Sequence, residues 1–521
     1  MTDGPSDPVS CVHSLRAYQA TIGLGRVPCT ISRIWRDKLS YHRCFSLYFA
    51  AMMIVITLGC SKDSEHEAKT TQPTTPPPPL MVLILDDPPL AAAIERQWAA
   101  RADGQLQIQQ TTTDDLLSER RRHLAADAVI FPSWLIGELA EQNLISPIPP
   151  ATLNSPEFGR RDIFDLIRQS EIVWGDRVFG VPLGSPALTL LYRSDIFEAI
   201  DAKPPETWGE YQQLAQRLAD FRGIDDLQID ESERWHPVIE PLGDGWASQI
   251  LLARAAGYSR HRNYYSTLFD SRTMEPLIAG PPFVRALEEL VAVHRGKSPE
   301  MLAFGPADAR RALIAGRCAM AITWPSRIED HGDSPASTGV FPLAAAELPG
   351  SRDVFNLGDQ KWHPRSRSED GRATLLGVSG RMGAVSTFSR QPQAALNLLV
   401  SLSSTDWSEQ ISPFSESTGL YRSSQIPFVS SWLGPNFETA RMYGELVSDI
   451  HRRSLWLTSL RIPGRSRYLS KLDTAVQSAV AGDLTPSDAL KQVAEQWQAI
   501  TEELGVQAQK NAYLRSLGME P

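Results

Sequence analysis

The sequence predicts an α/β fold built on a parallel-rich sheet, and three successive strand candidates support this prediction. Residues 80–85 form a continuous apolar run, which is typical of a strand buried on both faces. Residues 105–109 alternate polar and apolar side chains, and residues 128–131 form a third strand candidate. Helical spacing fills the segments between them, for example over residues 90–102. A strand–helix–strand–helix–strand order implies parallel strands with right-handed crossovers.

Composition and charge restrict the class of function. The 521 residues, 42% of them hydrophobic, exceed what one core usually serves, so we expect two or more domains. A formal charge of −10 carries no signature of a nucleic-acid partner. Five cysteines in a chain of this length exclude a disulfide scaffold.

The N-terminal segment has the layout of a secretory leader. A basic flank ending at Arg43 precedes an apolar stretch over residues 45–58, which is short for a membrane span of about 20 residues. Cys60 directly follows Gly59 and resembles the lipobox cysteine of bacterial lipoproteins, although Thr57 stands where that motif usually has leucine. We therefore predict a leader over residues 1–60 and a lipid on Cys60, which anchors the protein to a membrane. An uncleaved N-terminal anchor is the alternative.

The segment that follows Cys60 supports this anchor. Residues 61–79 are polar and end in four consecutive prolines, so they cannot pack and instead favour an extended tether. If Cys60 carries a lipid, Cys318 is the one cysteine left in the exported chain. We expect Cys318 to be a buried thiol.

Polar and aromatic residues follow the first and third predicted strands. Ligands of parallel sheets bind at the carboxyl ends of the strands, so these residues are candidates to line a ligand crevice. An alternative role for the aspartates is helix capping, and an alternative for the phenylalanine is ordinary core packing. The candidates are Asp86, Asp87, Phe131, Ser133 and Trp134.

Short segments along the chain resemble, in order, motifs of one protein family. They cover residues 127–131, 144–148, 177–182, 191–197, 204–211, 309–322, 375–380, 394–399 and 482–490. Within them, Thr207 and Glu210 have the spacing of a helix capping box. The order resembles that of the family 1 extracellular solute-binding proteins, the maltose-binding-protein-like receptors of ABC importers, over about residues 80–505.

The resemblance implies the type II periplasmic-binding-protein fold. In that fold two lobes, each a parallel-rich sheet flanked by helices, are joined by three hinge crossings and close around a ligand. We place the crossings near residues 187–190, 376–382 and 417–421. The implied divisions are residues 80–187 plus 382–418 for lobe one, residues 188–376 plus 420–508 for lobe two, and residues 509–521 for a C-terminal tail.

The resemblance also points to a small solute, with a carbohydrate favoured. A sugar has polar edges and apolar faces, so its site combines aromatic platforms with carboxylates and other polar groups. Trp324 follows the predicted strand over residues 319–322, and Trp246 precedes a helix; both also fit core packing. Further candidates are Asp244, Trp134, Ser185, Tyr192 and Arg422. The segments 131–133 and 377–380 depart from the family pattern, which leaves the class of ligand open.

Catalytic interpretations find little support. Residues 377–381 lack the final glycine of a nucleophile elbow, and the sequence has no phosphate-binding loop. The ten histidines have no metal-ligand spacing. We therefore expect no enzyme, metal or cofactor, but a monomeric receptor on the periplasmic or outer side of a bacterial membrane that delivers its solute to an ABC permease. A receptor for a non-sugar solute, or a binding module that feeds a sensor, are the alternatives.

Overall fold

The computed structural model describes residues 78–101, 104–118, 123–219, 221, 235–295, 299–327, 341–433 and 440–521. The predicted leader, Cys60 and almost all of the tether lie outside these residues. Within the described ranges, no helix has both the length and the apolar character that crossing a membrane requires.

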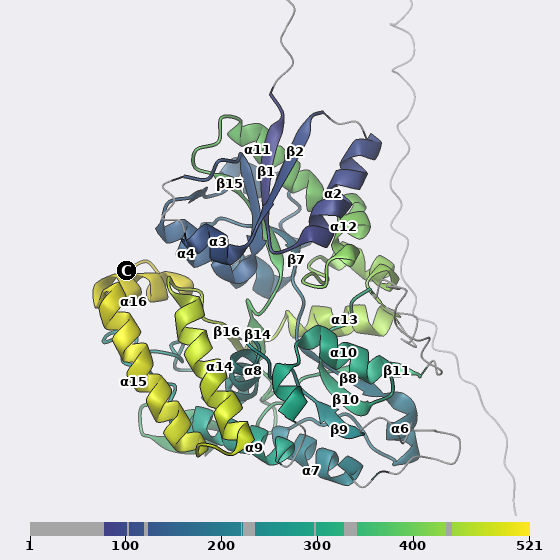
Figure 1. The fold of residues 1–521 in the computed structure, drawn as a ribbon, viewed down its shortest axis with the longest axis vertical. Coiled ribbons are helices and arrows are strands. Elements are labelled where there is room, and N and C mark those ends of the chain that lie inside the picture. The colour runs from purple at the N-terminus through teal and green to yellow at the C-terminus, as the bar shows by residue number, and fades with distance from the viewer. Residues whose placement is uncertain are drawn as a thin grey trace, which may run out of the picture. The chain divides into compact units, whose positions relative to one another are not determined.

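The first sheet has six strands in the order β2-β1-β3-β15-β4, with β7 also paired to β15 (Figure 1). Strands β2, β1 and β3 run parallel, as predicted, whereas β15 runs antiparallel to β3, β4 and β7. The strand bounds are Leu80–Leu85 for β1, Leu106–Thr111 for β2, Ala128–Pro132 for β3, Ile145–Ser146 for β4, Val181–Gly184 for β7 and Arg381–Ser386 for β15.

Helices pack on this first sheet and make up the first lobe with it. Helix α11 contacts β3, β7 and β15, while α2 contacts β2 and α12. The start of α2 follows from its sequence, because Pro88 suits the first helical turn and the Asp87 carboxylate accepts a hydrogen bond from the backbone of Leu90. The helix bounds are Pro88–Arg101 for α2, Thr113–Ser118 for α3, Ile136–Glu141 for α4, Pro150–Leu153 for α5, Pro392–Leu402 for α11 and Thr405–Ile411 for α12.

The second lobe contains a four-stranded sheet of order β11-β8-β10-β9. Strand β10 runs parallel to β9 and antiparallel to β8, which is also antiparallel to β11. Cys318 is a buried thiol in β10. The bounds are Thr189–Arg193 for β8, His236–Ile239 for β9, Cys318–Thr323 for β10 and Leu343–Glu347 for β11. Short strand pairs join β5 (Val173–Trp174) to β6 (Arg177–Val178), β12 (Asp353–Asn356) to β13 (Lys361–Pro364) and β14 (Thr374–Leu376) to β16 (Trp456–Thr458).

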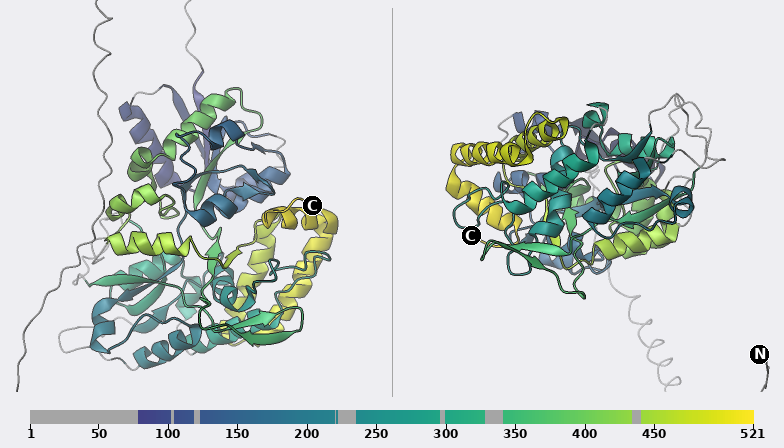
Figure 2. Two further views of the ribbon diagram at one scale, coloured as in Figure 1. Left: turned by 180° about the vertical axis from the view of Figure 1, so that it is seen from behind. Right: turned by 90° about the horizontal axis from the view of Figure 1, so that it is seen from below.

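Helix α8 lies at the centre of the second lobe, and every one of its residues is buried. It packs against α9 and α14, and α14 lies beside α15, as Figure 2 shows. The capping box predicted at the start of α7 is present, since Thr207 and Glu210 exchange hydrogen bonds. The helix bounds are Ser194–Ala199 for α6, Trp208–Ala219 for α7, Ala247–Ser259 for α8, Pro281–His294 for α9, Pro306–Ile314 for α10, Ala440–Ile450 for α13, Arg465–Ala481 for α14, Pro486–Leu504 for α15 and Val506–Ser516 for α16.

A buried ion pair holds α8 to the second sheet. The Arg254 guanidinium on α8 lies 2.8 Å from the carboxylate of Glu240, and both side chains are 0% exposed. The Tyr211 hydroxyl donates a hydrogen bond to the same carboxylate, and the Trp208 ring lies 4.1 Å from the guanidinium. Burial alone would raise the pKa of Glu240, but the charge of Arg254 and the imidazole of His294 hold this pKa at about 2. The pair is therefore ionised at neutral pH.

The chain passes between the two sheets more than once. It leaves the first sheet after β7 for β8 of the second sheet, and it returns to the first sheet at β15, after β14 of the separate β14–β16 pair. Residues 509–521, expected to be a tail, are mostly part of helix α16, in which Ala512 and Tyr513 are buried. Arg515 of this helix forms an ion pair with Glu141 of α4, so the C-terminal segment joins the second lobe to the first.

Candidate functional site

Polar residues gather at the carboxyl edge of the first sheet. Strands β1, β3 and β7 end here, and the antiparallel strand β15 begins here, since Arg381 pairs with Pro132 and with Gly184. This register brings together side chains that are far apart in the sequence. Ligands of α/β sheets commonly bind at such an edge. They are Asp87, Ser133, Glu171, Ser185 and Arg381, and all of them are buried.

Glu171 is the buried carboxylate of this edge, and the sequence analysis did not select it. It ends the π-helical turn Ile167–Glu171 and is 1% exposed. Its Oε2 accepts a hydrogen bond from the Ser185 hydroxyl, whereas no described group donates a well-oriented hydrogen bond to its Oε1. Burial raises the pKa of Glu171, although Ser185, Ser133 and the charge of Arg461 offset part of that effect. The Oε1 atom is thus a buried acceptor with unused capacity.

Asp87 and Arg381 form an ion pair beside it. The Arg381 Nε lies 2.9 Å from the Asp87 Oδ2, which also accepts a hydrogen bond from Ser415. The Arg381 Nη2 donates to the backbone carbonyl of Asp86. The carboxylate of Asp86 accepts a hydrogen bond from the backbone of Thr113 at the start of α3. Asp86 therefore caps α3, and Asp87 caps α2. Asp87 nevertheless lies among the other polar groups of the edge, while Asp86 is exposed.

Two tryptophans of the second lobe reach the same region. The rings of Trp324, which follows β10, and Trp246, which precedes α8, lie 5.6 Å apart. Trp324 is 4% exposed, and its Nε1 donates a 2.9 Å hydrogen bond to the carbonyl of Glu416. Glu416 directly follows Ser415, the hydrogen-bond partner of Asp87. Two hydrogen bonds, from Trp324 to Glu416 and from Ser415 to Asp87, therefore connect Trp324 to the polar edge of the first lobe.

Trp134 and Arg465 make a second connection between the lobes. The Arg465 guanidinium, at the start of α14, lies 4.2 Å from the centre of the Trp134 ring. Burial lowers the pKa of Arg465 to about 9, and the carboxylate of Asp473 opposes this shift. Asp473 accepts hydrogen bonds from the backbone of Gly245 and of Ser248, next to Trp246.

These contacts, together with the electrostatic interaction between Arg465 and Asp473, define a set of residues that we call the interlobe ring. Arg465 and Asp473 interact through their charges, and every other member contacts the next directly or through an adjacent residue. Five of the predicted ligand contacts belong to the ring. Its members are Trp134, Arg465, Asp473, Trp246, Trp324, Ser415, Asp87, Arg381 and Ser133. Glu171 and Ser185 adjoin Ser133.

Three other predicted residues lie outside the ring. Phe131 is 0% exposed within β3, opposite Met382, and is part of the core. Tyr192 packs on Phe197 and pairs with Met320, inside the second sheet. Asp244 is exposed on the loop before Trp246, and its carboxylate accepts a hydrogen bond from the side chain of Gln477.

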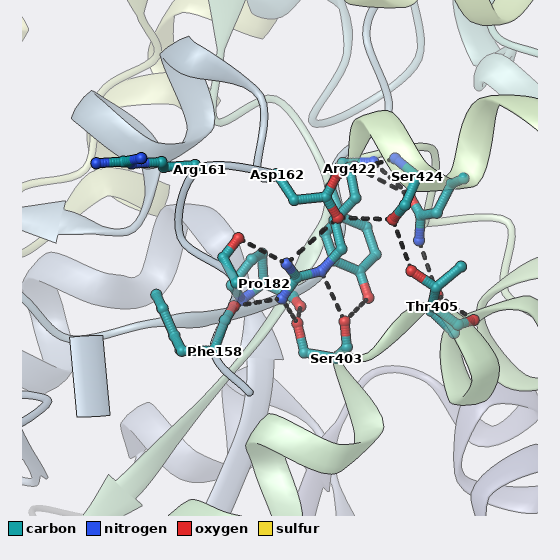
Figure 3. A network of polar contacts seen from close by, with 12 residues as sticks. Phe158, Arg161, Asp162, Pro182, Ser403, Thr405, Arg422 and Ser424 are labelled. Atoms are coloured by element: carbon teal, nitrogen blue, oxygen red, sulfur yellow. Dashed lines mark hydrogen bonds and ion pairs between the residues drawn. The ribbon is translucent and has the colours of Figure 1, made fainter. Parts of the chain in front are cut away.

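Arg422 is also outside the ring, at the centre of a separate polar network (Figure 3). Its Nε donates to the carbonyl of Ser403, and its Nη2 donates to the Ser403 hydroxyl and to the carbonyl of Phe158. Its Nη1 donates to the carbonyl of Gly159 and lies 3.7 Å from Asp162. These bonds occupy the guanidinium within the protein, so the role that the structure gives Arg422 is to join three segments of the first lobe.

Sequence reasoning missed Glu171, Arg465 and Ser415, and no local motif marks them. Each reaches the ring or its neighbourhood from a segment whose position depends on packing between elements distant in sequence. In the structure, Arg465 begins helix α14 directly after Gly464, which adopts a positive φ of 81°. The left-handed conformation at Gly464 sets the direction in which α14 leaves the preceding loop.

The sequence profile of the bacterial extracellular solute-binding proteins matches residues 91–399. The chain belongs to this family. The predicted resemblance and the two-lobed type II α/β fold are thereby confirmed, and the family is one of receptors and not of enzymes. No curated protein matches this solute-binding protein by sequence.

Solved structures of similar fold match this chain over nearly their whole length. An ABC transporter solute-binding protein from Agrobacterium radiobacter K84, in complex with ribitol, is 15% identical with a TM-score of 0.59, and the match covers 81% of this chain and 98% of that one. The sugar-binding protein MalE from Xanthomonas citri is 13% identical with a TM-score of 0.59, covering 82% and 98%. Maltose-bound MalE3 from T. maritima is 16% identical with a TM-score of 0.57, covering 81% and 100%.

Proposed function

We propose that this protein is a lipid-anchored extracytoplasmic receptor that binds a small carbohydrate or polyol at the interlobe ring and delivers it to an ABC importer. The observation that carries the proposal is the unused buried acceptor of Glu171 beside the hydroxyls of Ser133 and Ser185. A sugar hydroxyl can donate to that oxygen. The indoles of Trp246, Trp324 and Trp134 supply apolar surface for the C–H face of a sugar ring.

Proteins of similar fold support the same class of ligand. The solved structures of similar fold include complexes with ribitol, D-mannitol and α-D-tagatose. A non-sugar or acidic solute is the second candidate, because Arg465 has a buried Nε without a hydrogen-bond partner among the described residues. A carboxylate on the solute would satisfy that donor.

A thermal-shift screen of neutral sugars, polyols and sugar acids tests the proposal and separates the two candidates. A solute at about 100 times its dissociation constant should add roughly 2.7 kcal/mol of stability. Neutral sugars or polyols are expected to shift the melting temperature, whereas a shift by sugar acids alone would favour the second candidate. Failure of all of them would contradict a sugar receptor.

With the solute from this screen, Glu171→Gln should weaken binding by about tenfold or more, since hydrogen bonds to charged groups contribute about 1.5–3 kcal/mol. The amide is isosteric and neutral, so the fold should survive the change. Titration calorimetry on both proteins measures the effect. Glu95→Gln, at an exposed carboxylate on α2, is the matched control and should leave the affinity unchanged. An affinity within twofold of the parent for Glu171→Gln would remove Glu171 from the site.

The proposed lipid on Cys60 has its own test in a bacterial host. Cys60→Ala should move the protein from the membrane fraction to the soluble fraction and remove the lipid mass from the N-terminal peptide. Cys318→Ala, at the buried thiol of β10, is the control and should stay with the membrane. Unchanged membrane partition of Cys60→Ala, with no lipid mass on the parent peptide, would instead support the uncleaved anchor.

A further inference from the structure

A polar cavity of about 100 Å³ is lined by none of the residues of the interlobe ring. Gln169, Ser170 and Val173 line one part of it. The other lining residues come from strand β16, Arg461, the C-terminal segment 513–518 and the segment 260–267. Two of its lining residues are arginines, and several others carry hydroxyl groups. Its polar lining includes Arg260, Arg461, Thr267, Thr458 and Tyr513.

Arg461 is a buried cation whose hydrogen-bond acceptors in the described residues are all neutral backbone carbonyls. It is 1% exposed, and its guanidinium donates to the backbone carbonyls of Ser170, Glu171 and Ser516. Its Nε has no hydrogen-bond partner among the described residues. Burial lowers the pKa of Arg461 to about 10, and the carboxylate of Glu171, which is bonded to Ser185, opposes this shift.

Arg260 has the same pattern on the other side of the cavity. Its Nη1 donates to the carbonyls of Tyr264 and Tyr265, and its Nε also lacks a partner in the described part of the chain. Burial lowers the pKa of Arg260 as well. None of the residues that line the cavity is an aspartate or glutamate. Two arginines therefore line one small cavity, and its lining residues include no carboxylate.

We propose that this cavity binds a small oxyanion, such as inorganic phosphate, sulfate or a carboxylate. A buried charge is costly unless it is paired, and the planar guanidinium matches the oxygens of these anions. The hydroxyls of Thr458 and Tyr513 add hydrogen-bonding capacity at the same cavity. The volume exceeds what a single water needs, which is about 10–15 Å³ on the same measure. The site does not depend on the identity of the transported solute.

The first test is titration calorimetry with inorganic phosphate, sulfate and acetate, each at constant ionic strength set with potassium chloride. Saturable binding with a dissociation constant of about 1 mM or tighter is expected for at least one anion, which corresponds to about −4.1 kcal/mol. Arg260→Gln should weaken it at least tenfold, whereas Arg260→Lys keeps the charge and should weaken it less. Arg272→Gln, at a side chain 88% exposed, is the control. No saturable heat with any of the three anions, or equal binding by Arg260→Gln, would overturn the proposal.

A second experiment, on variants of Thr458, tests the proposal even if the Arg260 variants fail to fold. Thr458→Glu would place a carboxylate at the cavity and should both raise the melting temperature and abolish the response to phosphate. Thr458→Gln, of the same size but neutral, should do neither. A carboxylate buried without cationic partners is destabilising, so a lower melting temperature for Thr458→Glu than for Thr458→Gln would contradict an anion site.

Discussion

Arg254→Ala should destabilise the protein by about 3–5 kcal/mol, because removal of one partner leaves the other charge buried and unpaired. The remaining Glu240 carboxylate is 0% exposed and would keep the neutral hydroxyl of Tyr211 and the imidazole of His294 as polar partners. The variant also loses the contact of the guanidinium with the Trp208 ring, at 4.1 Å. Urea unfolding at neutral pH, followed by tryptophan fluorescence, measures the change.

Two further variants show whether the cause is the unpaired charge. The double substitution Arg254→Met with Glu240→Leu removes both charges and should lose less stability than Arg254→Ala alone. Arg272→Ala removes an exposed guanidinium and should have almost no effect. A loss below about 1 kcal/mol for Arg254→Ala would mean that the buried pair is not a major source of stability.

Trp324→Ala should cost about 3–5 kcal/mol of stability even without a ligand, as expected for a large aromatic removed from a core. The indole is 4% exposed, packs against Trp246 and donates a hydrogen bond to the carbonyl of Glu416. Sequence reasoning left two roles open for Trp324, a stacking platform with an intact fold or a core residue. Its burial favours a structural role, and contact with a ligand stays a prediction.

Thermal and urea melts of three variants distinguish the contributions. Trp324→Phe keeps most of the apolar surface but removes the hydrogen bond to Glu416, so it should cost less than Trp324→Ala. Trp246→Ala, at a half-buried side chain, should also cost less. An unchanged melting temperature for Trp324→Ala, combined with a strong loss of solute affinity, would instead favour the stacking platform.

Local patterns were sufficient to predict many elements of the fold. The apolar run at residues 80–85 is β1, the capping box at Thr207 begins α7, and residues 319–322 lie in β10. These features depend on side-chain period, capping chemistry and burial, all of which are written in a few neighbouring residues. The segment 509–521 was expected to be a C-terminal tail, and most of it lies in helix α16, which contacts α4 and β5.

The sequence by itself determined the α/β class, the order of the strands along the chain and the family to which the protein belongs. It also indicated the edge of the first sheet, because residues after parallel strands must meet there. Only the tertiary structure decided which polar groups meet at that edge. Glu171, Ser415 and Arg465 belong to segments that are distant in the sequence. Arg422 lies away from that edge and donates hydrogen bonds to backbone carbonyls. The physical reason is that a buried polar group must find partners wherever the fold provides them, and those partners are set by long-range packing and not by neighbours in sequence.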